Sequence, residues 1–176
     1  MKQEKMKLIL VRHPETNNNS KGIIEDQMSG DFTSKGKTQM VSLMEKLKNK
    51  KIDLIYSSDS IRCKRLAIML SKFKNIKVMF DPLLREINNG NWVGKKEDEV
   101  KVLNDLGIDS KNGESFLNFK QRVLSFLNKL QIDDKNLLII THGCFIKIFI
   151  GSQKGLSINN SLKIKVENCS INEVEI

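Results

Sequence analysis

The sequence KLILVRHPET, residues 7–16, decides how the rest of the chain can fold. The four consecutive apolar residues Leu8–Val11 predict a short strand buried on both faces, as found inside parallel sheets. The strand is expected to end before Pro14, because proline has no N–H with which to extend a sheet ladder. Arg12 and His13 would therefore lie just past the carboxyl end of a central strand, where open α/β sheets bind their ligands.

The chain contains only two histidines, and the second follows a similar apolar run. Residues 137–140 predict another buried strand, and His142 belongs to the polar segment Thr141–Gly143 that comes directly after it. Each histidine alone could be an incidental turn residue. If the two strands are neighbours, however, both imidazoles face one crevice at the same edge of the sheet.

Composition bounds the class of protein. With 39% hydrophobic and 29% charged residues the chain is typical of globular proteins, and we expect one domain over residues 1–176. No apolar run approaches the ~20 residues that span a bilayer, and the first run is too short for a signal-peptide core. We therefore expect a cytoplasmic protein with no membrane contact.

A formal net charge of +9 raises the hypothesis of a nucleic-acid partner. The lysines are spread along the whole chain, with no dense block and little aromatic interleaving, so solvated helix faces explain most of them. We expect no nucleic-acid partner, and we expect the positive charge to attract small anionic substrates instead.

The three cysteines, Cys63, Cys144 and Cys169, form no CxxC pair, and the histidines add no zinc-type spacing. The thiol of Cys144 lies close in sequence to His142 and could be a nucleophile. A small buried residue at the start of a helix is the simpler interpretation.

Apolar spacing predicts the remaining elements. The stretch 83–94 is expected to be an ordered loop around Trp92, and Ser58 is expected to cap the helix that follows it. The alternating tail predicts two antiparallel strands that close the sheet at one edge, Leu162–Val166 and Cys169–Ile176. Two further buried strands are expected at 52–56 and 76–80, and helices are expected at 34–50, 61–70, 97–106, 116–130 and 143–150.

The predicted elements bring basic groups to one edge of the sheet. Arg62 would lie in the first turn of its helix, at the carboxyl edge that also carries Arg12, His13 and His142. Two guanidinium groups match phosphate oxygens in charge and geometry. The first turn of this helix, and of the helix that begins at Gly143, would add positive partial charge.

The same arrangement would allow covalent chemistry at phosphorus. His13 can act as a nucleophile if one ring nitrogen is unprotonated and the other is held by a carbonyl. A leaving alkoxide needs a proton, and Glu86 is the best acid in the ordered loop. From the residues alone, the convergence of these groups is an assumption.

Six segments of the chain also carry motifs: Arg12–Thr16 with Asn19, Thr33–Gln39, Ser57–Arg62, Leu84–Gly94, Asn112–Ser115 with Arg122, and Thr141–Gly143. In this order they resemble the signature of the histidine phosphatase superfamily, which is phosphoglycerate mutase-like. The resemblance implies a three-layer α/β/α fold with a mostly parallel central sheet and an antiparallel edge. It also implies a phosphohistidine intermediate formed without a metal or an organic cofactor.

The resemblance gives each matching residue a role. His13 would take the phosphoryl group, and Asn19 would add a phosphate contact from the loop. Glu86 would protonate the leaving oxygen and then activate the water that hydrolyses the intermediate. The groups that would hold the phosphoryl oxygens through bond breaking are Arg12, Arg62, His142 and the helix start at Gly143.

Three positions depart from the family pattern. Pro14 stands where glycine is usual, and its carbonyl could still hold a ring nitrogen of His13. Asp26 stands where a glycine near the pocket is common, which would add negative charge and disfavour highly anionic substrates. Arg65 replaces a glutamine, and we expect it to be an exposed charge.

The segment from Gly94 to Gly113 is short and leaves little chain for a lid that would exclude water. It favours a phosphatase of the broad-specificity or α-ribazole phosphatase type, acting on a small phosphorylated metabolite. The alternatives are phosphoglycerate mutase-type phosphoryl transfer and a non-catalytic phosphate-binding regulatory domain. An exposed edge strand could support a homodimer.

Overall fold

The computed structural model describes residues 7–105, 110–130 and 136–175, and every structural statement concerns these residues. They form a five-stranded sheet in the order β3-β2-β4-β1-β5. Strands β1 to β4 are parallel, whereas β5 pairs antiparallel with β1. The strands are β1 Lys7–Arg12, β2 Leu54–Ser57, β3 Val78–Phe80, β4 Leu137–Thr141 and β5 Ile171–Glu175.

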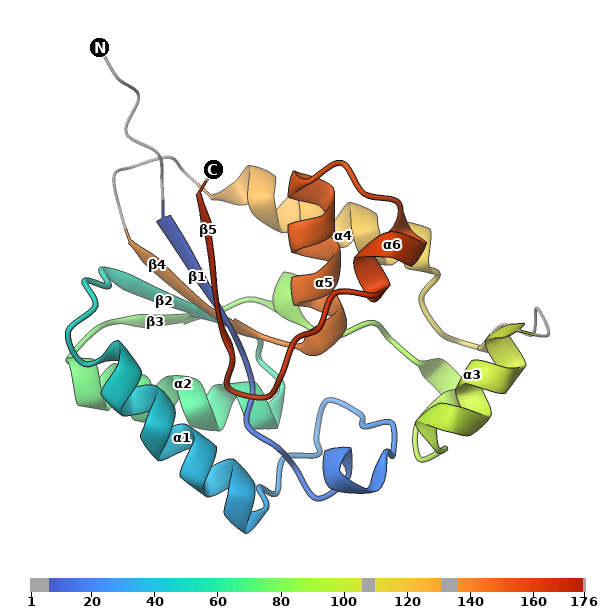
Figure 1. Cartoon of the computed structure of the whole chain (residues 1–176), viewed down its shortest axis with the longest axis horizontal. Coiled ribbons are helices and arrows are strands. Elements are labelled where there is room, and N and C mark those ends of the chain that lie inside the picture. Colours follow the sequence, from blue (N-terminus) through green and yellow to red (C-terminus); the bar gives the residue numbers. More distant parts are fainter. Residues whose placement is uncertain (1–6, 106–109, 131–135, 176) are drawn as a thin grey trace.

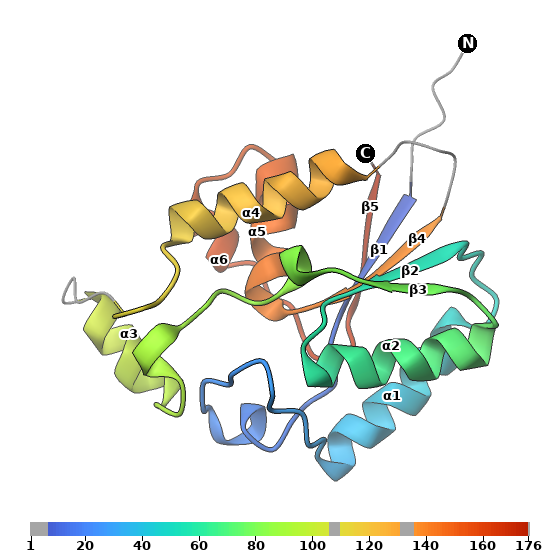
Figure 2. The same ribbon diagram turned by 180° about the vertical axis from the view of Figure 1, so that it is seen from behind.

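Helices cover both faces of the sheet, and Figures 1 and 2 show the resulting three layers. Helices α1 Ser34–Leu47 and α2 Ile61–Lys74 lie on one face. The other face is covered by α4 Phe116–Lys129, α5 Gly143–Gln153 and α6 Ile158–Leu162. Helix α3, Glu97–Asp105, stands apart from both helix layers. The predicted three-layer α/β/α fold with an antiparallel edge is confirmed.

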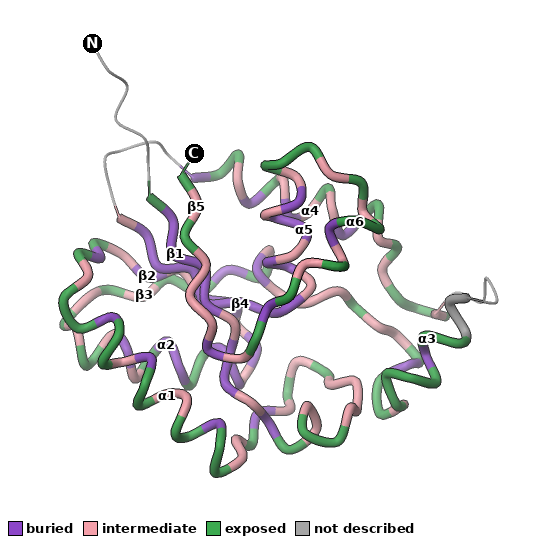
Figure 3. Tube along the Cα trace, viewed as in Figure 1, coloured by how far each residue is buried: buried purple, intermediate pink, exposed green. Residues whose placement is uncertain are grey.

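The apolar run in β1 is explained by this two-sided cover. Leu8 and Leu10 pack into the core beneath α4 and α5, whereas Ile9 and Val11 pack into the core beneath α1 and α2. Figure 3 shows β1 and β4 as largely buried strands between the two helix layers. A strand with one wet face would have alternated, so the continuous run reports its central position.

The predicted first strand of the tail, Leu162–Val166, is wrong. Leu162 is the last residue of α6, which Ser157 caps by accepting a hydrogen bond from the amide of Asn160. Val166 is buried in the core beside α5 without belonging to a strand. Apolar alternation here reflects residues that pack individually on the core, so only β5 adds to the sheet edge.

Several element boundaries also differ from the predictions. β2 begins at Leu54 and β3 at Val78, and α2 begins at Ile61 with Ser60 at the capping position. The loop around Trp92 is ordered as expected, and Trp92 is buried with only 8% of the residue exposed.

The predicted end of the helix 97–106 and the last residue of the tail lie partly outside the described residues, at Leu106 and Ile176. Within the described residues, no helix combines the length and apolar character needed to cross a membrane.

Candidate active site

The two histidines meet at the carboxyl ends of β1 and β4. These strands are neighbours in the sheet, with Arg12 opposite Thr141, and the amide of His13 donates to the Thr141 carbonyl at 3.0 Å. The ring centroids of His13 and His142 are 5.2 Å apart in an edge arrangement. The predicted adjacency of the two strands is confirmed, and it brings both imidazoles to one place.

His13 is held in one tautomer by the backbone. Its Nδ1 lies 2.9 Å from the carbonyl oxygen of Pro14, which only accepts, so the proton of the neutral ring sits on Nδ1. Burial and the nearby charges of Arg62 and Arg12 hold the pKa of His13 well below its ordinary value of 6.5. The ring is therefore neutral at physiological pH, and Nε2 keeps its lone pair.

His142 is neutral for similar reasons. Burial first, then the charge of Arg62, the adjacent imidazole of His13 and the charge of Arg12, hold the pKa of His142 well below its ordinary value. Its Nε2 lies 3.0 Å from the hydroxyl of Ser58, which also accepts from the amide of Ser60. The hydroxyl of Ser60 lies 3.2 Å from the same Nε2, and either hydroxyl can donate to it when the ring proton is on Nδ1. That Nδ1 is buried and has no hydrogen-bond partner among the described residues.

Each pocket arginine is anchored by one nitrogen. Nη1 of Arg12, the last residue of β1, donates to the carbonyl of Val166 at 2.8 Å. Nη1 of Arg62 donates to the carbonyls of Asp26 and Ser29. The Nε atoms of both arginines are buried without a hydrogen-bond partner in the described part of the chain. Both guanidinium groups are thus fixed and keep donors available for a ligand.

Gly143 makes room for one of these guanidinium groups. A Cβ added at this position would lie 3.3 Å from Nε of Arg12, closer than side chains normally approach. Two amides of the first turn of α5, at Cys144 and Phe145, donate to the carboxylate of Glu86 at 3.0 and 3.2 Å. A carboxylate of the chain therefore occupies two amides of this helix start, and the phosphate-binding role of Gly143 stays a prediction.

The loop that carries Glu86 is fixed from behind by Arg122. The guanidinium of Arg122 donates to the carbonyls of Leu83 and Arg85 at 2.8 Å each and to that of Glu86 at 3.1 Å. It also forms an ion pair of 2.7 Å with Glu114. Two of the motif residues recognised in the sequence therefore act by positioning this loop.

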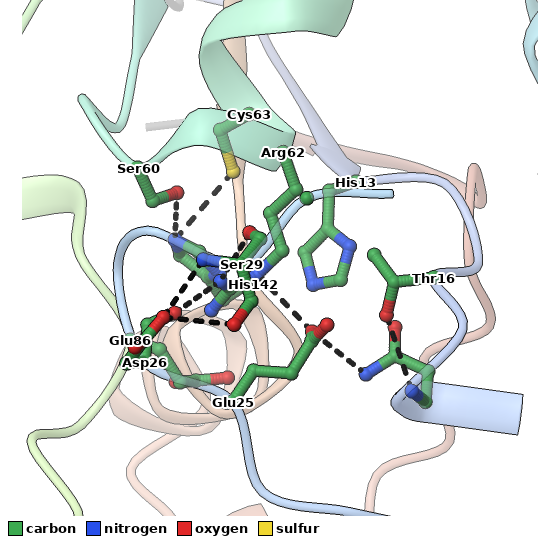
Figure 4. Close-up of polar contacts among 12 residues, drawn as sticks. His13, Thr16, Glu25, Asp26, Ser29, Ser60, Arg62, Cys63, Glu86 and His142 are labelled. Atoms are coloured by element: carbon green, nitrogen blue, oxygen red, sulfur yellow. Dashed lines mark hydrogen bonds and ion pairs between the residues drawn. The ribbon is translucent and has the colours of Figure 1, made fainter. Parts of the chain in front are cut away.

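Asn19 lies beside an acid that the sequence analysis missed. Its Nδ2 donates to the carboxylate of Glu25 at 3.2 Å, and the same carboxylate lies 3.6 Å from Nε of Arg62. Figure 4 shows Glu25 between Arg62 and the loop around Thr16. Asn168, also missed, donates to the carbonyl of His13 at 3.0 Å.

Asp26 and Arg65 lie outside this arrangement. The carboxylate of Asp26 accepts hydrogen bonds from the amides of Met28 and Ser29 in its own loop, and the residue is exposed. The expectation that Asp26 adds charge to the pocket is therefore wrong. The side chain of Arg65 is 52% exposed and donates to the carbonyl of Gly30, as expected for a surface charge.

A pocket of about 390 Å³ opens over these groups. Residues Glu97, Val100 and Lys101 of helix α3 line one side of it, and the expectation that this segment leaves little chain for a lid stays a prediction. His142 is fully buried beside His13 and does not belong to the lining. The predicted site residues that line the pocket are Arg12, His13, Asn19, Arg62, Glu86 and Gly143. The apolar lining residues are Ile23, Ile24, Ile87, Val100 and Phe116.

Neutral imidazoles, guanidinium groups and a carboxylate around one pocket at the end of a parallel sheet are features of phosphoryl-transfer enzymes with an α/β fold. The family model of the histidine phosphatase superfamily (branch 1) matches residues 8–176. The chain belongs to this family. The predicted family, and with it the class of phosphoric monoester hydrolases, is confirmed.

Individual relatives are similar over nearly the whole chain. The chain is 30% identical over 183 residues to the "Putative phosphoserine phosphatase 2" of Hydrogenobacter thermophilus, covering 97% of this chain and 89% of the relative. It is 28% identical to the "Probable phosphoglycerate mutase GpmB" of Erwinia tasmaniensis, covering 97% and 85%. The crystal structure of the α-ribazole phosphatase from Shigella flexneri matches with a TM-score of 0.86 at 24% identity, covering 97% and 91%, which supports the fold.

Proposed function

We propose that this protein is a phosphatase that hydrolyses a small phosphomonoester through a phosphohistidine intermediate on His13. The observation that carries the proposal is the state of the His13 ring. It is neutral, its Nδ1 is tied to the carbonyl of Pro14, and its Nε2 lone pair is available beside two anchored guanidinium groups. A nucleophile for phosphorus needs this combination of a free lone pair and nearby positive charge.

In the first half-reaction, Arg12 and Arg62 hold the phosphoryl oxygens. His142 lies beneath the pocket lining, and its unpartnered Nδ1, protonated in this proposal, donates to one of these oxygens. Nε2 of His13 attacks phosphorus, and the bond from phosphorus to the ester oxygen breaks. Glu86 enters this step protonated and gives its proton to the departing oxygen, so that an alcohol leaves. The fixed guanidinium groups stabilise the charge that develops on the phosphoryl oxygens.

In the second half-reaction, Glu86, now ionised, takes a proton from a water molecule. The water oxygen attacks phosphorus, the bond to Nε2 of His13 breaks, and inorganic phosphate is released. Each group returns to its starting protonation state. Neither half-reaction calls on a metal ion, so hydrolysis is expected to persist in EDTA.

The pocket beyond the phosphoryl site supports a compact alcohol with apolar character. Its walls carry isoleucine side chains from two loops and Phe116 at the start of α4. Two of the similar proteins bear the names of hydrolases, phosphoserine phosphatase and α-ribazole phosphatase, which supports hydrolysis as the reaction. A second relative bears the name of a phosphoglycerate mutase, so phosphoryl transfer back to a sugar acid is the competing candidate.

The deciding experiment follows the phosphoryl group. The wild-type protein is mixed with a ³²P-labelled phosphomonoester in EDTA and quenched within one turnover. We expect an acid-labile, base-stable label on the protein and release of inorganic phosphate. His13→Gln should show neither. With labelled 4-nitrophenyl phosphate, whose leaving group needs little protonation, Glu86→Gln should accumulate the label because hydrolysis of the intermediate slows.

Full turnover by His13→Gln would refute the proposal. A protein that binds phosphate without releasing it from any ester in a phosphometabolite panel would instead be a phosphate-binding regulatory domain. Quantitative transfer of the label to a second alcohol, in place of release as inorganic phosphate, would identify a mutase.

A further inference from the structure

The carboxylate of Glu25 lies against two groups that the family resemblance assigns to phosphate, the amide of Asn19 and the guanidinium of Arg62. It accepts a hydrogen bond from Nδ2 of Asn19 at 3.2 Å and lies 3.6 Å from Nε of Arg62. The Glu25 side chain is only 4% exposed, and it lines the same pocket as His13. In Figure 4 it lies between Arg62 and the loop that follows β1. An internal anion therefore sits where a phosphate dianion would interact.

The backbone on both sides holds Glu25 in this position. Before it, the amide of Ile24 donates to the carbonyl of Lys95 at 3.0 Å, and the carbonyl of Ile24 accepts from the amide of Gly94 at 2.9 Å. After it, the carbonyl of Asp26 accepts from the guanidinium of Arg62. Because the chain is anchored on either side, the carboxylate is a fixed component of the pocket.

Charge in the rest of the pocket makes this carboxylate consequential. The lining contains four basic residues and three acidic ones, namely Arg12, Arg62, Lys101 and Lys147 against Glu25, Glu86 and Glu97. The carboxylate of Glu86 accepts a hydrogen bond from an amide of α5. The carboxylate of Glu25 forms an ion pair with the guanidinium of Arg62, which the proposed reaction uses to hold the phosphoryl group. Its charge is therefore felt most strongly by the phosphate and by groups attached near it.

We propose that Glu25 is a specificity-determining residue. It selects phosphomonoesters whose alcohol carries a neutral or cationic group near the phosphate, and it selects against esters that carry a second anionic group there. The proposal rests on the proposed phosphatase function of the same pocket. Unit charges several ångströms apart at a partly buried site change affinity by roughly tenfold or more.

A purely structural role predicts a different result. If Glu25 only holds Arg62 in place, removing its charge should weaken all esters alike. Glu25→Gln separates the two roles, because the amide oxygen can still accept from Asn19 and face Arg62 while the negative charge is lost. Glu25→Ala removes both the charge and the acceptor.

The test compares three esters: 4-nitrophenyl phosphate, phosphoethanolamine and 3-phosphoglycerate, with neutral, cationic and anionic alcohols. We expect Glu25→Gln to raise kcat/KM for 3-phosphoglycerate relative to phosphoethanolamine by about tenfold or more, with 4-nitrophenyl phosphate in between. The matched control is Glu45→Gln on α1, which makes the same change in net charge at an exposed site. This control should leave the ratio unchanged.

An unchanged ratio in Glu25→Gln would overturn the proposal, as would an equal shift in the Glu45→Gln control. Binding of the same esters is measured by calorimetry in parallel. If the wild-type protein hydrolyses none of these three esters, the binding ratio alone decides the role of Glu25, and the phosphometabolite panel decides the phosphatase proposal separately. Thermal unfolding of Glu25→Gln and Glu25→Ala shows whether either variant is folded, and the ratio from the folded variant decides.

Discussion

Replacing Arg122 should separate the positioning of the acid from the binding of phosphate. Its guanidinium ties Glu114 to three carbonyls of the loop that carries Glu86, and its side chain is only 19% exposed. Within the described residues it does not belong to the pocket lining. Arg122→Met keeps most of the aliphatic stem and removes every donor.

The expected magnitude follows from these contacts. Removing one partner of a buried pair costs about 3–5 kcal/mol, because the remaining charge is left without compensation. Glu114 is 17% exposed and can recover some hydration, so we expect Arg122→Met to lower the free energy of unfolding by about 3 kcal/mol. The carboxylate of Glu86 keeps its bonds to the amides of α5, so positioning is impaired but not abolished.

The kinetic consequence should depend on the leaving group. An alkyl phosphate needs a proton on its departing oxygen, whereas 4-nitrophenolate leaves without much help. We expect kcat to fall by roughly 10–100-fold for an alkyl phosphate and by much less for 4-nitrophenyl phosphate. The affinity for inorganic phosphate should change little, because Arg12 and Arg62 are untouched.

The measurements are urea unfolding and kcat for the two esters, with Arg122→Lys as the matched control. Lysine keeps the charge but loses the planar fork, so Arg122→Lys should recover part of the stability and little of the alkyl phosphate activity. Equal losses on both esters, or an unfolding free energy equal to that of the wild type, would refute this account of Arg122.

Three further predictions follow. Gly36→Ala should destabilise by about 1–3 kcal/mol in urea unfolding, because its Cβ would meet the carbonyl of Glu15; wild-type stability would exclude this contact. The pKa values of His13 and His142 lie below 6.5 in the folded state, so the unfolded chain protonates first. Stability should fall below that pH by about 1.4 kcal/mol per unit for each histidine; a flat pH profile of unfolding would contradict this. Burial raises the pKa of Cys63 to about 12, so its thiol should react with iodoacetamide only after unfolding.

The sheet was predictable because burial on both faces leaves a continuous pattern in the sequence. Leu8–Val11 and Leu137–Ile140 are apolar at every position, and both are central strands. The position of Arg12, His13 and His142 was also predictable. Proline or glycine follows each strand closely and ends it, so these side chains lie at the carboxyl edge of the sheet. The tail was harder, because Leu162–Val166 alternates like a strand while each apolar residue packs singly on the core.

The second layer of the site was not predictable from spacing. Asn168 reaches the carbonyl of His13 across 155 positions of sequence, and Ser58 approaches His142 across 84. Such partners depend on which strands become neighbours and in which register. That information arises from the packing of the whole chain.

Two adjacent acidic residues in the loop after β1 also show what the sequence could not predict. Sequence alone offers Glu25 and Asp26 with equal charge, and the departure from the family pattern directed attention to Asp26. The structure resolves the choice by local hydrogen bonding. The short side chain of Asp26 accepts from the amides of Met28 and Ser29, two and three residues on, which is the turn that aspartate favours.

Once that turn forms, the carbonyl of Asp26 is directed at Arg62, and Glu25 is the acid whose carboxylate reaches the pocket. An aspartate followed two and three residues later by free amides is therefore a signal that its own carboxylate is engaged locally. This pattern in the sequence would have predicted that Glu25, and not Asp26, disfavours anionic substrates. An additional negative charge near the pocket was therefore predictable from the sequence, whereas its assignment to Glu25 depended on the turn that Asp26 forms.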